Sequence, residues 1–368
     1  MERILHVVTY MGRGGLETML MNYYRHIDRN KIQFDFLVHR DFEADYDEEI
    51  LSLGGKIYHI SRLVPWSLSY REKLKSFLNS HTEYQIIHVH QDCLSAVALR
   101  CAAECGIPIR IAHSHSSSQT KDFKYPFKLF YKRFIPRYAT HLIACSKAAG
   151  KWMFHSDDFI VMNNAIDAQK YTFNPVAREN MRNSLHIGAN ELVIGHVGRF
   201  EAPKNHDFIV DIFADILEQH SAKLLLVGDG SRKEAISEKV AALGISDKVI
   251  FTGVRSDVAD LLQAMDIFVF PSLYEGLGIV AVEAQAAGLP CIISDVVPRE
   301  SILTDLVVQL PLSAGIDTWE RRIIEASRMT RQDTYQLICD RGFDIHTCAH
   351  NLEIYYEKIA SGEKEVCL

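Results

Sequence analysis

The sequence predicts an α/β fold of two consecutive domains, each a doubly wound parallel sheet covered by helices. The chain has 368 residues, which exceeds one ordinary α/β core and suits two domains of about 150–200 residues each. Short apolar runs alternate with amphipathic helical stretches in both halves, as in parallel sheets. With 48% hydrophobic and 24% charged residues, the composition is that of a globular protein with a sizeable core.

In the first half, we expect six strands joined by helical stretches, of which the clearest are residues 17–26 and 95–105. These strands are expected at residues 4–9, 34–38, 56–60, 86–90, 109–113 and 141–145.

The second half repeats this pattern after an Asn-rich loop near residues 163–167. Strands are expected at residues 192–197, 223–227, 249–252, 267–271 and 290–294, with helices at 206–220, 231–243 and 258–264. A final helix, residues 345–359, could cap either half. Ligands of open parallel sheets bind outside the carboxyl ends of the strands, so functional residues are expected in those loops.

Charge and hydropathy exclude several classes of protein. A net charge of -7 and a pI near 6.2 give no global basic field for nucleic acid. No stretch approaches the roughly 20 apolar residues of a membrane helix. The apolar run at residues 4–8 is interrupted too early, at Gly12, for a signal peptide. The eight cysteines form no C-x-x-C pair, which favours reduced thiols and a cytoplasmic location.

The strongest motif runs from Glu275 to Glu283, between the strand at 267–271 and a helix ending near residue 287. Its glycines at 276 and 278 permit close approach of backbone N–H groups, and a helix N-terminus favours an anion such as phosphate. The carboxylates could accept hydrogen bonds from sugar or ribose hydroxyls. The structural alternative is that Glu283 is a solvated helix residue without a functional role. Its apolar sequence neighbours instead indicate a packed position, in which a carboxylate needs a partner.

Two further loops suit a phosphate-bearing ligand. Arg199 and Lys204, in the loop after residues 192–197, would bring two positive charges to a diphosphate. Gly14 and Gly15 precede the first helix and would allow close backbone approach to phosphate, although the G-x-G-x-x-G dinucleotide fingerprint is absent. Solvated surface cations and an ordinary turn are the structural alternatives.

Together these motifs resemble family 4 glycosyltransferases of the GT-B fold, especially bacterial capsular and exopolysaccharide members. The resemblance covers nearly the whole chain and is densest at residues 194–295, including HVGRFEAPKNH, LLLVGDG, VIFTGVRSDV and PSLYEGLGIVAVEAQAAGLPCIISD. It implies two Rossmann-like domains facing a central cleft. The acceptor-side domain would span residues 1–165 with a returning helix at 345–362, and the donor-binding domain residues 170–344.

The resemblance also assigns roles to individual residues. Arg199 and Lys204 would bind the diphosphate, Glu283 the ribose hydroxyls and Glu275 the donor sugar. The remaining donor contacts would come from the backbone or loops at Gly14, Gly15, Gly253, Val254, Leu277 and Gly278.

A histidine at a strand end of the first domain would lie near the reacting carbon and the acceptor. His113 and His115 are the candidates, and we favour His115 because it is further into the loop. His88 and His90 end the preceding strand and would shape the acceptor side. A zinc site from His88, His90 and Cys93 is a weaker alternative. The D-x-D sequence at residues 45–47 reads as a solvated acidic face.

The reaction implied is metal-independent transfer with retention at the anomeric carbon, without a resident cofactor. The donor would be a nucleotide sugar, with uracil as the base by resemblance, and the acceptor a glycan or lipid-linked saccharide. Residues 121–134 interleave basic and aromatic side chains, which fits peripheral contact with the inner face of the plasma membrane. A helix with a core-facing aromatic side and solvated lysines is the alternative.

Two other functions remain open from the sequence. A nucleotide-sugar 2-epimerase of the same architecture would lack the paired glutamates together with the Arg199 and Lys204 arrangement. A catalytically inactive sugar-nucleotide-binding homologue is harder to separate, because binding residues alone do not establish turnover. The linker has Ala165 where many family members have glycine, which affects only the local turn.

Overall fold

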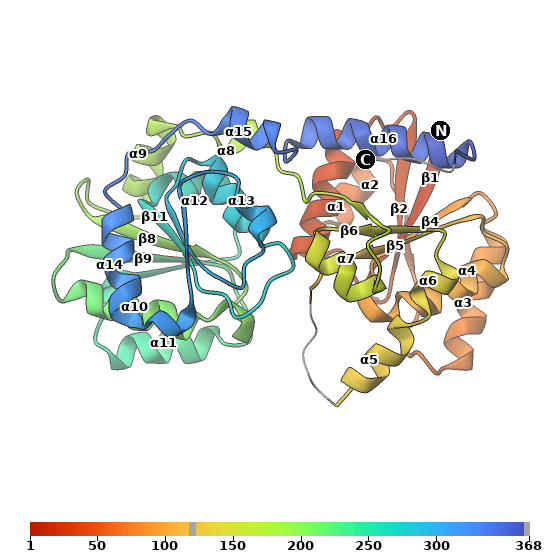
Figure 1. Cartoon of the computed structure of the whole chain (residues 1–368), viewed down its shortest axis with the longest axis horizontal. Helices are drawn as coiled ribbons and strands as arrows, with labels where there is room; N and C mark the ends of the chain where they lie inside the picture. The colour runs from red at the N-terminus through yellow and green to blue at the C-terminus, as the bar shows by residue number, and fades with distance from the viewer. Residues whose placement is uncertain (118–122, 364–368) are drawn as a thin grey trace. The chain divides into compact units, whose positions relative to one another are not determined.

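Two parallel β-sheets, one in each of two units, organise the computed structural model, which describes residues 1–117 and 123–363 (Figure 1). The N-terminal unit comprises Met1–Ile166 and the chain from Gly342 onward, and the C-terminal unit comprises Asp167–Arg341. The chain therefore passes from the first unit to the second and returns once.

The N-terminal unit is built on a seven-stranded sheet in the order β3-β2-β1-β4-β5-β6-β7, with every neighbouring pair parallel. The order reverses between β1 and β4, where doubly wound sheets bind ligands. The strands are β1 Glu2–Val7, β2 Ile32–Val38, β3 Ile57–His59, β4 Ile86–Val89, β5 Ile109–Ser114, β6 His141–Ala144 and β7 Ile160–Val161.

Helices cover both faces of this sheet, and one of them comes from the end of the chain (Figure 1). Tyr355 and Tyr356 of that last helix are buried in the same core cluster as the side chains of α1 and β2. The helices are α1 Gly15–His26, α2 Asp47–Ser52, α3 Leu68–Ser80, α4 Ser95–Glu104, α5 Tyr125–Lys132, α6 Ile135–Tyr138, α7 Lys147–Phe154 and α16 Ile345–Ala360.

The C-terminal unit has a six-stranded parallel sheet in the order β10-β9-β8-β11-β12-β13, so its order reverses between β8 and β11. Two apolar clusters, one containing Phe213 and Trp319 and the other Phe268 and Phe270, form its core. The strands are β8 Leu192–Val197, β9 Ala222–Val227, β10 Val249–Gly253, β11 Ile267–Phe270, β12 Cys291–Ser294 and β13 Val307–Leu310. The helices are α8 Ala168–Tyr171, α9 Pro175–Ser184, α10 His206–Leu217, α11 Lys233–Ala242, α12 Val258–Ala264, α13 Ile279–Ala286, α14 Ile316–Ala326 and α15 Tyr335–Asp340.

The expected α/β fold of two Rossmann-like sheets is confirmed, and each of the eleven expected strands is present within two residues of its expected ends. The strands β7 and β13 were not expected. Within the part of the chain that the structure describes, no helix has the length and apolar character needed to cross a membrane.

Candidate functional site

The loops at the switch point of the C-terminal unit carry most of the residues expected to bind the donor. The loop after β8 contains Gly198 and Arg199, and the loop after β11 leads to Glu275 and α13. Gly228 lies so close to the first loop that a Cβ atom there would be 2.2 Å from the Gly198 carbonyl oxygen. Any side chain at position 228 would therefore displace this loop.

Lys204 and Glu275 meet directly. The Lys204 Nζ lies 2.6 Å from Glu275 Oε1, and the same oxygen accepts a 2.7 Å hydrogen bond from the Ser272 hydroxyl. The ammonium also lies 4.8 Å from the centre of the Phe270 ring. Both partners are largely buried, with 22% of the Lys204 side chain and 10% of the Glu275 side chain exposed. The pair fixes both side chains, and a bound anion could take over part of the lysine's interaction.

Arg199 differs from Lys204 because its side chain is exposed. Within residues 1–117 and 123–363 its guanidinium has no ion-pair partner. An unpaired guanidinium can form bidentate hydrogen bonds with phosphate without first breaking an internal contact. The two cations expected to bind the diphosphate therefore differ before the ligand binds. Lys204 is held in an ion pair with Glu275, whereas Arg199 has no ion-pair partner among the described residues.

Glu283 lies in α13, is only 8% exposed, and faces α8. Burial raises the pKa of its carboxyl to about 7, although a hydrogen bond with Tyr171 and the charge of Lys170 oppose this rise. A buried carboxyl with so few partners is costly for the protein alone and is typical of a functional position. The expectation that Glu283 is packed rather than solvated is met.

The first turn of α13 is available for hydrogen bonding. Its N-cap, Gly278, has a φ of 79°, a left-handed conformation that favours glycine, and no side-chain oxygen caps the helix. Among the described residues no partner is found for the N–H groups of Leu277 and Gly278. These donors and the positive end of the helix dipole could interact with a phosphate.

Gly253 is the last residue of the edge strand β10, and Val254 follows it. Gly253 has a φ of 69°, and its carbonyl accepts a hydrogen bond from the Gly228 N–H at 2.9 Å. The Val254 side chain is 56% exposed. Both residues therefore belong to the same set of loops as Gly198, at the carboxyl ends of neighbouring strands.

Gly14 and Gly15 lie in the other unit, where Gly14 is the N-cap of α1 and Gly15 its first residue. No side-chain oxygen caps this helix, and a Cβ atom on Gly15 would meet no atom within 4 Å. The first turn of α1 thus has open space beside it, as the expected approach of a phosphate requires.

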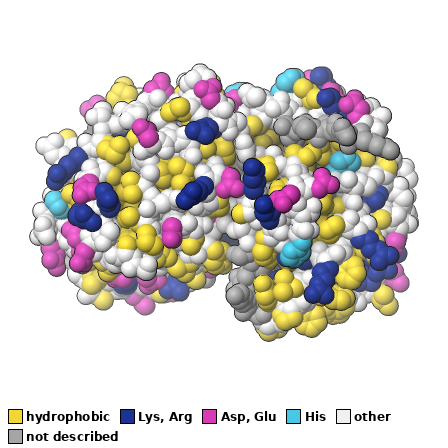
Figure 2. Space-filling model, in the orientation of Figure 1, with side chains coloured by type: hydrophobic (Ala, Val, Ile, Leu, Met, Phe, Trp, Pro, Cys, Tyr) yellow, Lys and Arg dark blue, Asp and Glu magenta, His cyan; other side chains and the backbone are white. Residues whose placement is uncertain are grey.

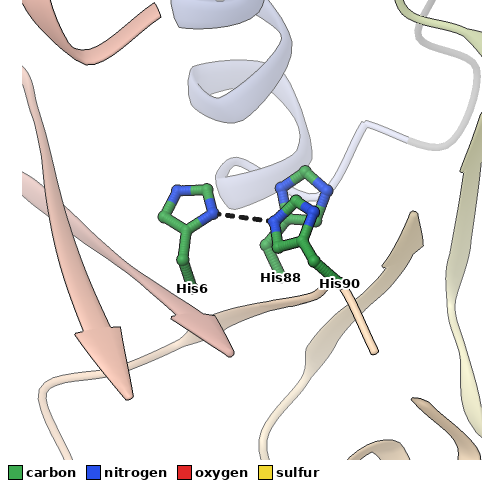
Figure 3. A group of neighbouring side chains, drawn as sticks. All are labelled: His6, His88 and His90. Atoms are coloured by element: carbon green, nitrogen blue, oxygen red, sulfur yellow. Dashed lines mark hydrogen bonds between the residues drawn. The ribbon is translucent and has the colours of Figure 1, made fainter. Parts of the chain in front are cut away.

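Five histidines gather at the carboxyl ends of β1, β4 and β5. His90 is central: its Nε2 lies 3.0 Å from His6 Nδ1, and its Nδ1 lies 2.9 Å from His115 Nε2 (Figure 3 shows His6, His88 and His90). His88 contacts the Tyr356 hydroxyl through Nδ1 at 2.8 Å. The His113 ring packs against that of His115 at a tilt, with ring centres 4.0 Å apart.

Burial keeps these imidazoles neutral. It lowers the pKa of His6 and of His115 to about 3, and it lowers the pKa values of His88, His90 and His113 well below the ordinary 6.5. His115 is the least buried of the five. A neutral His115 could exchange hydrogen bonds with a hydroxyl group of an acceptor or a donor sugar.

One weaker alternative is not supported, and one minor expectation needs correction. Cys93 does not join His88 and His90 in any group of potential metal ligands among the described residues, and burial raises the pKa of its thiol to about 12. In the D-x-D sequence, Asp45 is exposed as expected, but Asp47 is buried and accepts a hydrogen bond from the Ala44 N–H at 2.9 Å. Asp47 is therefore a turn-stabilising residue rather than part of a solvated face.

Four side chains that contact the expected site residues were not predicted from the sequence: His6, Tyr171, Ser272 and Tyr356. His6 could have been found, because it is paired with His88 across β1 and β4, and alternation along β4 places His90 on the same face. The other three come from distant elements or from a loop, where sequence spacing carries no comparable signal.

The segment around α5 has an unusual surface. Lys121 and Asp122, at its start, lie outside the described residues. Phe123 is 82% exposed, and Phe127 and Phe130 are each more than half exposed. The alternative of a core-facing aromatic side with solvated lysines is wrong at Lys132, which is buried and donates a 2.5 Å hydrogen bond to the Trp152 carbonyl.

Comparison with known proteins agrees with these features. Residues 13–170 match the family model described as Glycosyltransferase Family 4, and residues 177–334 match Glycosyl transferases group 1. EpsF of Bacillus subtilis (strain 168), named as a candidate glycosyltransferase, is 35% identical over 357 residues, which cover 93% of each chain. An Escherichia coli enzyme named UDP-Gal:alpha-D-GlcNAc-diphosphoundecaprenol alpha-1,3-galactosyltransferase is 26% identical over 58% of each chain.

Solved structures share the fold. Anabaena Alr3699/HepE, solved in complex with UDP, has a TM-score of 0.79 at 19% identity and covers 98% of this chain and 100% of its own. Sucrose-phosphate synthase of Thermosynechococcus elongatus has a TM-score of 0.80 at 17% identity with the same coverage. The chain therefore belongs to family 4 of the glycosyltransferases and is a glycosyltransferase of the GT-B fold.

Proposed function

We propose that the chain transfers a sugar from a UDP-sugar to a lipid-linked saccharide, with retention of the anomeric configuration, during synthesis of a cell-surface polysaccharide. The assignment of a nucleotide-sugar donor rests on one group of residues in the C-terminal unit. Lys204, Glu275 and the uncapped first turn of α13 form this group, and the buried Glu283 lies in the same helix. It combines positive charge, free N–H donors and carboxylate acceptors, which a nucleoside diphosphate sugar needs.

Two relatives support the choice of donor and acceptor. The Escherichia coli relative is named for a UDP-galactose donor and a diphosphoundecaprenol-linked acceptor. The Anabaena structural neighbour has been solved with UDP and with UDP-glucose. Both facts belong to those proteins, and for this chain they favour UDP over other nucleoside diphosphates and a lipid-linked over a free acceptor.

In the proposed mechanism, negative charge grows on the diphosphate as its bond to the anomeric carbon lengthens. Arg199, Lys204 and the N–H groups of Leu277 and Gly278 stabilise that charge, so no metal is required for this step. The acceptor hydroxyl attacks from the face that the diphosphate leaves, and the leaving phosphate accepts its proton. The sugar thus keeps its configuration, and the leaving group receives both the bonding electron pair and the proton.

Glu275 and His115 have supporting roles in this mechanism. Glu275 Oε1 already accepts from Lys204 and Ser272, so we assign it to sugar hydroxyls rather than to a covalent intermediate. His115, held by His90, is assigned to the acceptor side. The two-carboxylate scheme of glycosidases is disfavoured, because phosphate-binding features dominate the C-terminal loops.

The exposed aromatic residues around α5 support contact with the membrane that would carry the acceptor. Hydrophobic side chains gather at the lower edge of the N-terminal unit in Figure 2, in the region of α5 in Figure 1, with Lys and Arg beside them. Trp66, which is 66% exposed, extends this surface, and its ring centre lies 6.0 Å from that of Phe127. Aromatic and basic residues together suit an anionic lipid surface at the cytoplasmic face.

The test is a transfer assay with radiolabelled UDP-sugars and bacterial lipid-linked saccharides, followed by determination of the product's anomeric configuration. We expect one UDP-sugar to give a product of the donor's configuration. His115→Ala is expected to lower the rate of transfer at least 100-fold while UDP still binds, and His220→Ala, in the other unit, serves as control. Inverted configuration would contradict retention, and UDP binding without any transfer would favour an inactive homologue.

A further inference from the structure

The histidine cluster of the N-terminal unit contains more imidazoles than the proposed transfer uses. His6, His88 and His90 are each no more than 4% exposed. No carboxylate belongs to the cluster among the described residues. His6 lies in β1 and His88 in β4, the two strands that flank the switch point of this sheet, and His90 directly follows β4.

The sheet itself brings these three side chains together. His6 and His88 are direct partners in the parallel pairing of β1 and β4. His90 is two residues beyond His88, so it lies on the same face, and the two rings stack with centres 4.3 Å apart. One nitrogen from each of His6, His88 and His90 lies within 4.8 Å of the others (Figure 3).

Hydrogen bonds to one nitrogen of His88 and of His90 fix the orientation of these two rings. His88 Nδ1 is held by the Tyr356 hydroxyl at 2.8 Å, and its Nε2 is buried without a partner among the described residues. His90 Nδ1 is held by His115 at 2.9 Å, and its Nε2 points at His6. Metal-binding histidines commonly show this arrangement, in which a hydrogen bond to one nitrogen fixes the tautomer and the other faces the metal.

The separation between His6 and His90 is that of a hydrogen bond and is also close to the separation of two ligands of one ion. Their facing nitrogens are 3.0 Å apart. Two nitrogens bound to one tetrahedral zinc ion would be separated by about 3.3 Å, given zinc–nitrogen distances of about 2.0–2.1 Å. A chain of neutral imidazoles from His6 through His90 to His115 would account for these contacts, but it leaves the buried Nε2 of His88 without a partner among the described residues.

We propose that His6, His88 and His90 bind one divalent transition-metal ion of the zinc class. Three imidazoles form a donor set that suits zinc, copper, nickel or iron rather than magnesium or calcium. Water would supply a fourth ligand. The ion would bind His90 through Nε2 and so fix this ring, whose Nδ1 holds His115. Binding of the ion does not depend on the proposed function. The significance of fixing His115 rests on the proposed function, in which His115 lies on the acceptor side.

A second group, His90, His113 and His115, also has nitrogens within 4.8 Å. It competes with the first because both need His90. We favour the first, because Tyr356 and His115 orient its rings from outside, whereas neither nitrogen of His113 has a partner among the described residues. The variant His113→Phe separates the two, since it removes a ligand of the second group alone.

The experiment uses the full chain without a histidine tag, stripped with a chelator and then titrated with Zn²⁺ by calorimetry, with elemental analysis for stoichiometry. We expect one ion per chain. His6→Phe and His88→Phe should each weaken binding at least 100-fold, while His113→Phe and the distant control His220→Ala should stay within about threefold of wild type. His115→Ala should weaken binding about 10- to 100-fold, as loss of an outer hydrogen bond does.

Circular dichroism establishes that each variant is folded. X-ray absorption of the zinc-loaded wild type provides a readout that needs no variant, and three imidazole ligands are expected. A folded wild type that takes up no stoichiometric metal would overturn the proposal. So would wild-type affinity in folded His6→Phe, loss of binding in His113→Phe, or sulfur and carboxylate ligands in the absorption spectrum.

Discussion

Replacing Glu283 by glutamine tests whether its carboxyl is held in a buried position at a cost to stability. Glutamine keeps the shape of the side chain and removes its ionisation. The folded pKa of about 7 lies above the ordinary value of 4.5. Below pH 4.5 the carboxyl is protonated in both states. Between pH 4.5 and 7 the unfolded chain loses this proton while the folded chain keeps it, so the free energy of unfolding falls as pH rises. Above pH 7 both states are ionised, and the reduction in unfolding free energy stays constant.

The size of the effect follows from the two pKa values. The difference between 7 and 4.5 corresponds to about 3 kcal/mol of unfolding free energy at pH 8 and to about 1 kcal/mol at pH 5.5. Glu283→Gln should therefore be more stable than the wild type by these amounts. For a unit of this size, about 3 kcal/mol corresponds to a rise of roughly 6–12 °C in Tm at pH 8.

The measurement is thermal and urea unfolding of both proteins from pH 5.5 to pH 8. The exposed Glu238→Gln serves as the matched control and should show no such pH-dependent gain. At pH 8, where the wild-type carboxyl is ionised, the same Glu283→Gln variant should bind UDP at least tenfold more weakly, because a neutral amide is a weaker acceptor for ribose hydroxyls than a carboxylate. A stability gap that does not grow with pH, or a variant less stable at pH 8, would refute the reasoning from burial.

Four further predictions concern the other parts of the proposed site. Lys204→Met should weaken UDP binding at least tenfold by calorimetry, because it removes the buried cation; unchanged affinity would contradict its role. Tyr171→Phe removes the hydrogen bond that lowers the pKa of Glu283, so the midpoint of its titration by NMR should rise, and a fall would contradict the contact. His115→Ala should lower kcat at least 100-fold with UDP affinity within threefold; a parallel loss of UDP affinity would place it at the donor. Phe127→Glu should reduce sedimentation with phosphatidylglycerol vesicles several-fold, and unchanged sedimentation would exclude α5 from the membrane contact.

The fold was predictable because its buried strands are continuous apolar runs. All four residues of β4 and of β11 are buried, and such runs stand out between amphipathic helices. The two missed strands lack this signal. β7 has only two residues, and β13 is a partly exposed edge strand, so tertiary pairing rather than local pattern determines both.

The sequence singles out individual candidate residues, but it does not show how they pair. Glu283 stood out because it is a lone carboxylate in an apolar stretch. The contact of Lys204 with Glu275 joins residues 71 positions apart, and the contact of His88 with Tyr356 joins residues 268 apart. Spacing along the chain says nothing about such contacts, because they arise only when separate strand-end loops and the returning helix come together.

The most direct test of the proposed donor site is the thermal stability of the purified chain with UDP, GDP and ADP, each with and without EDTA. We predict preferential stabilisation by UDP that EDTA does not change and that Glu283→Gln and Lys204→Met reduce. A folded wild-type chain that none of the three nucleotides stabilises would contradict the assignment of the C-terminal loops to a nucleoside diphosphate.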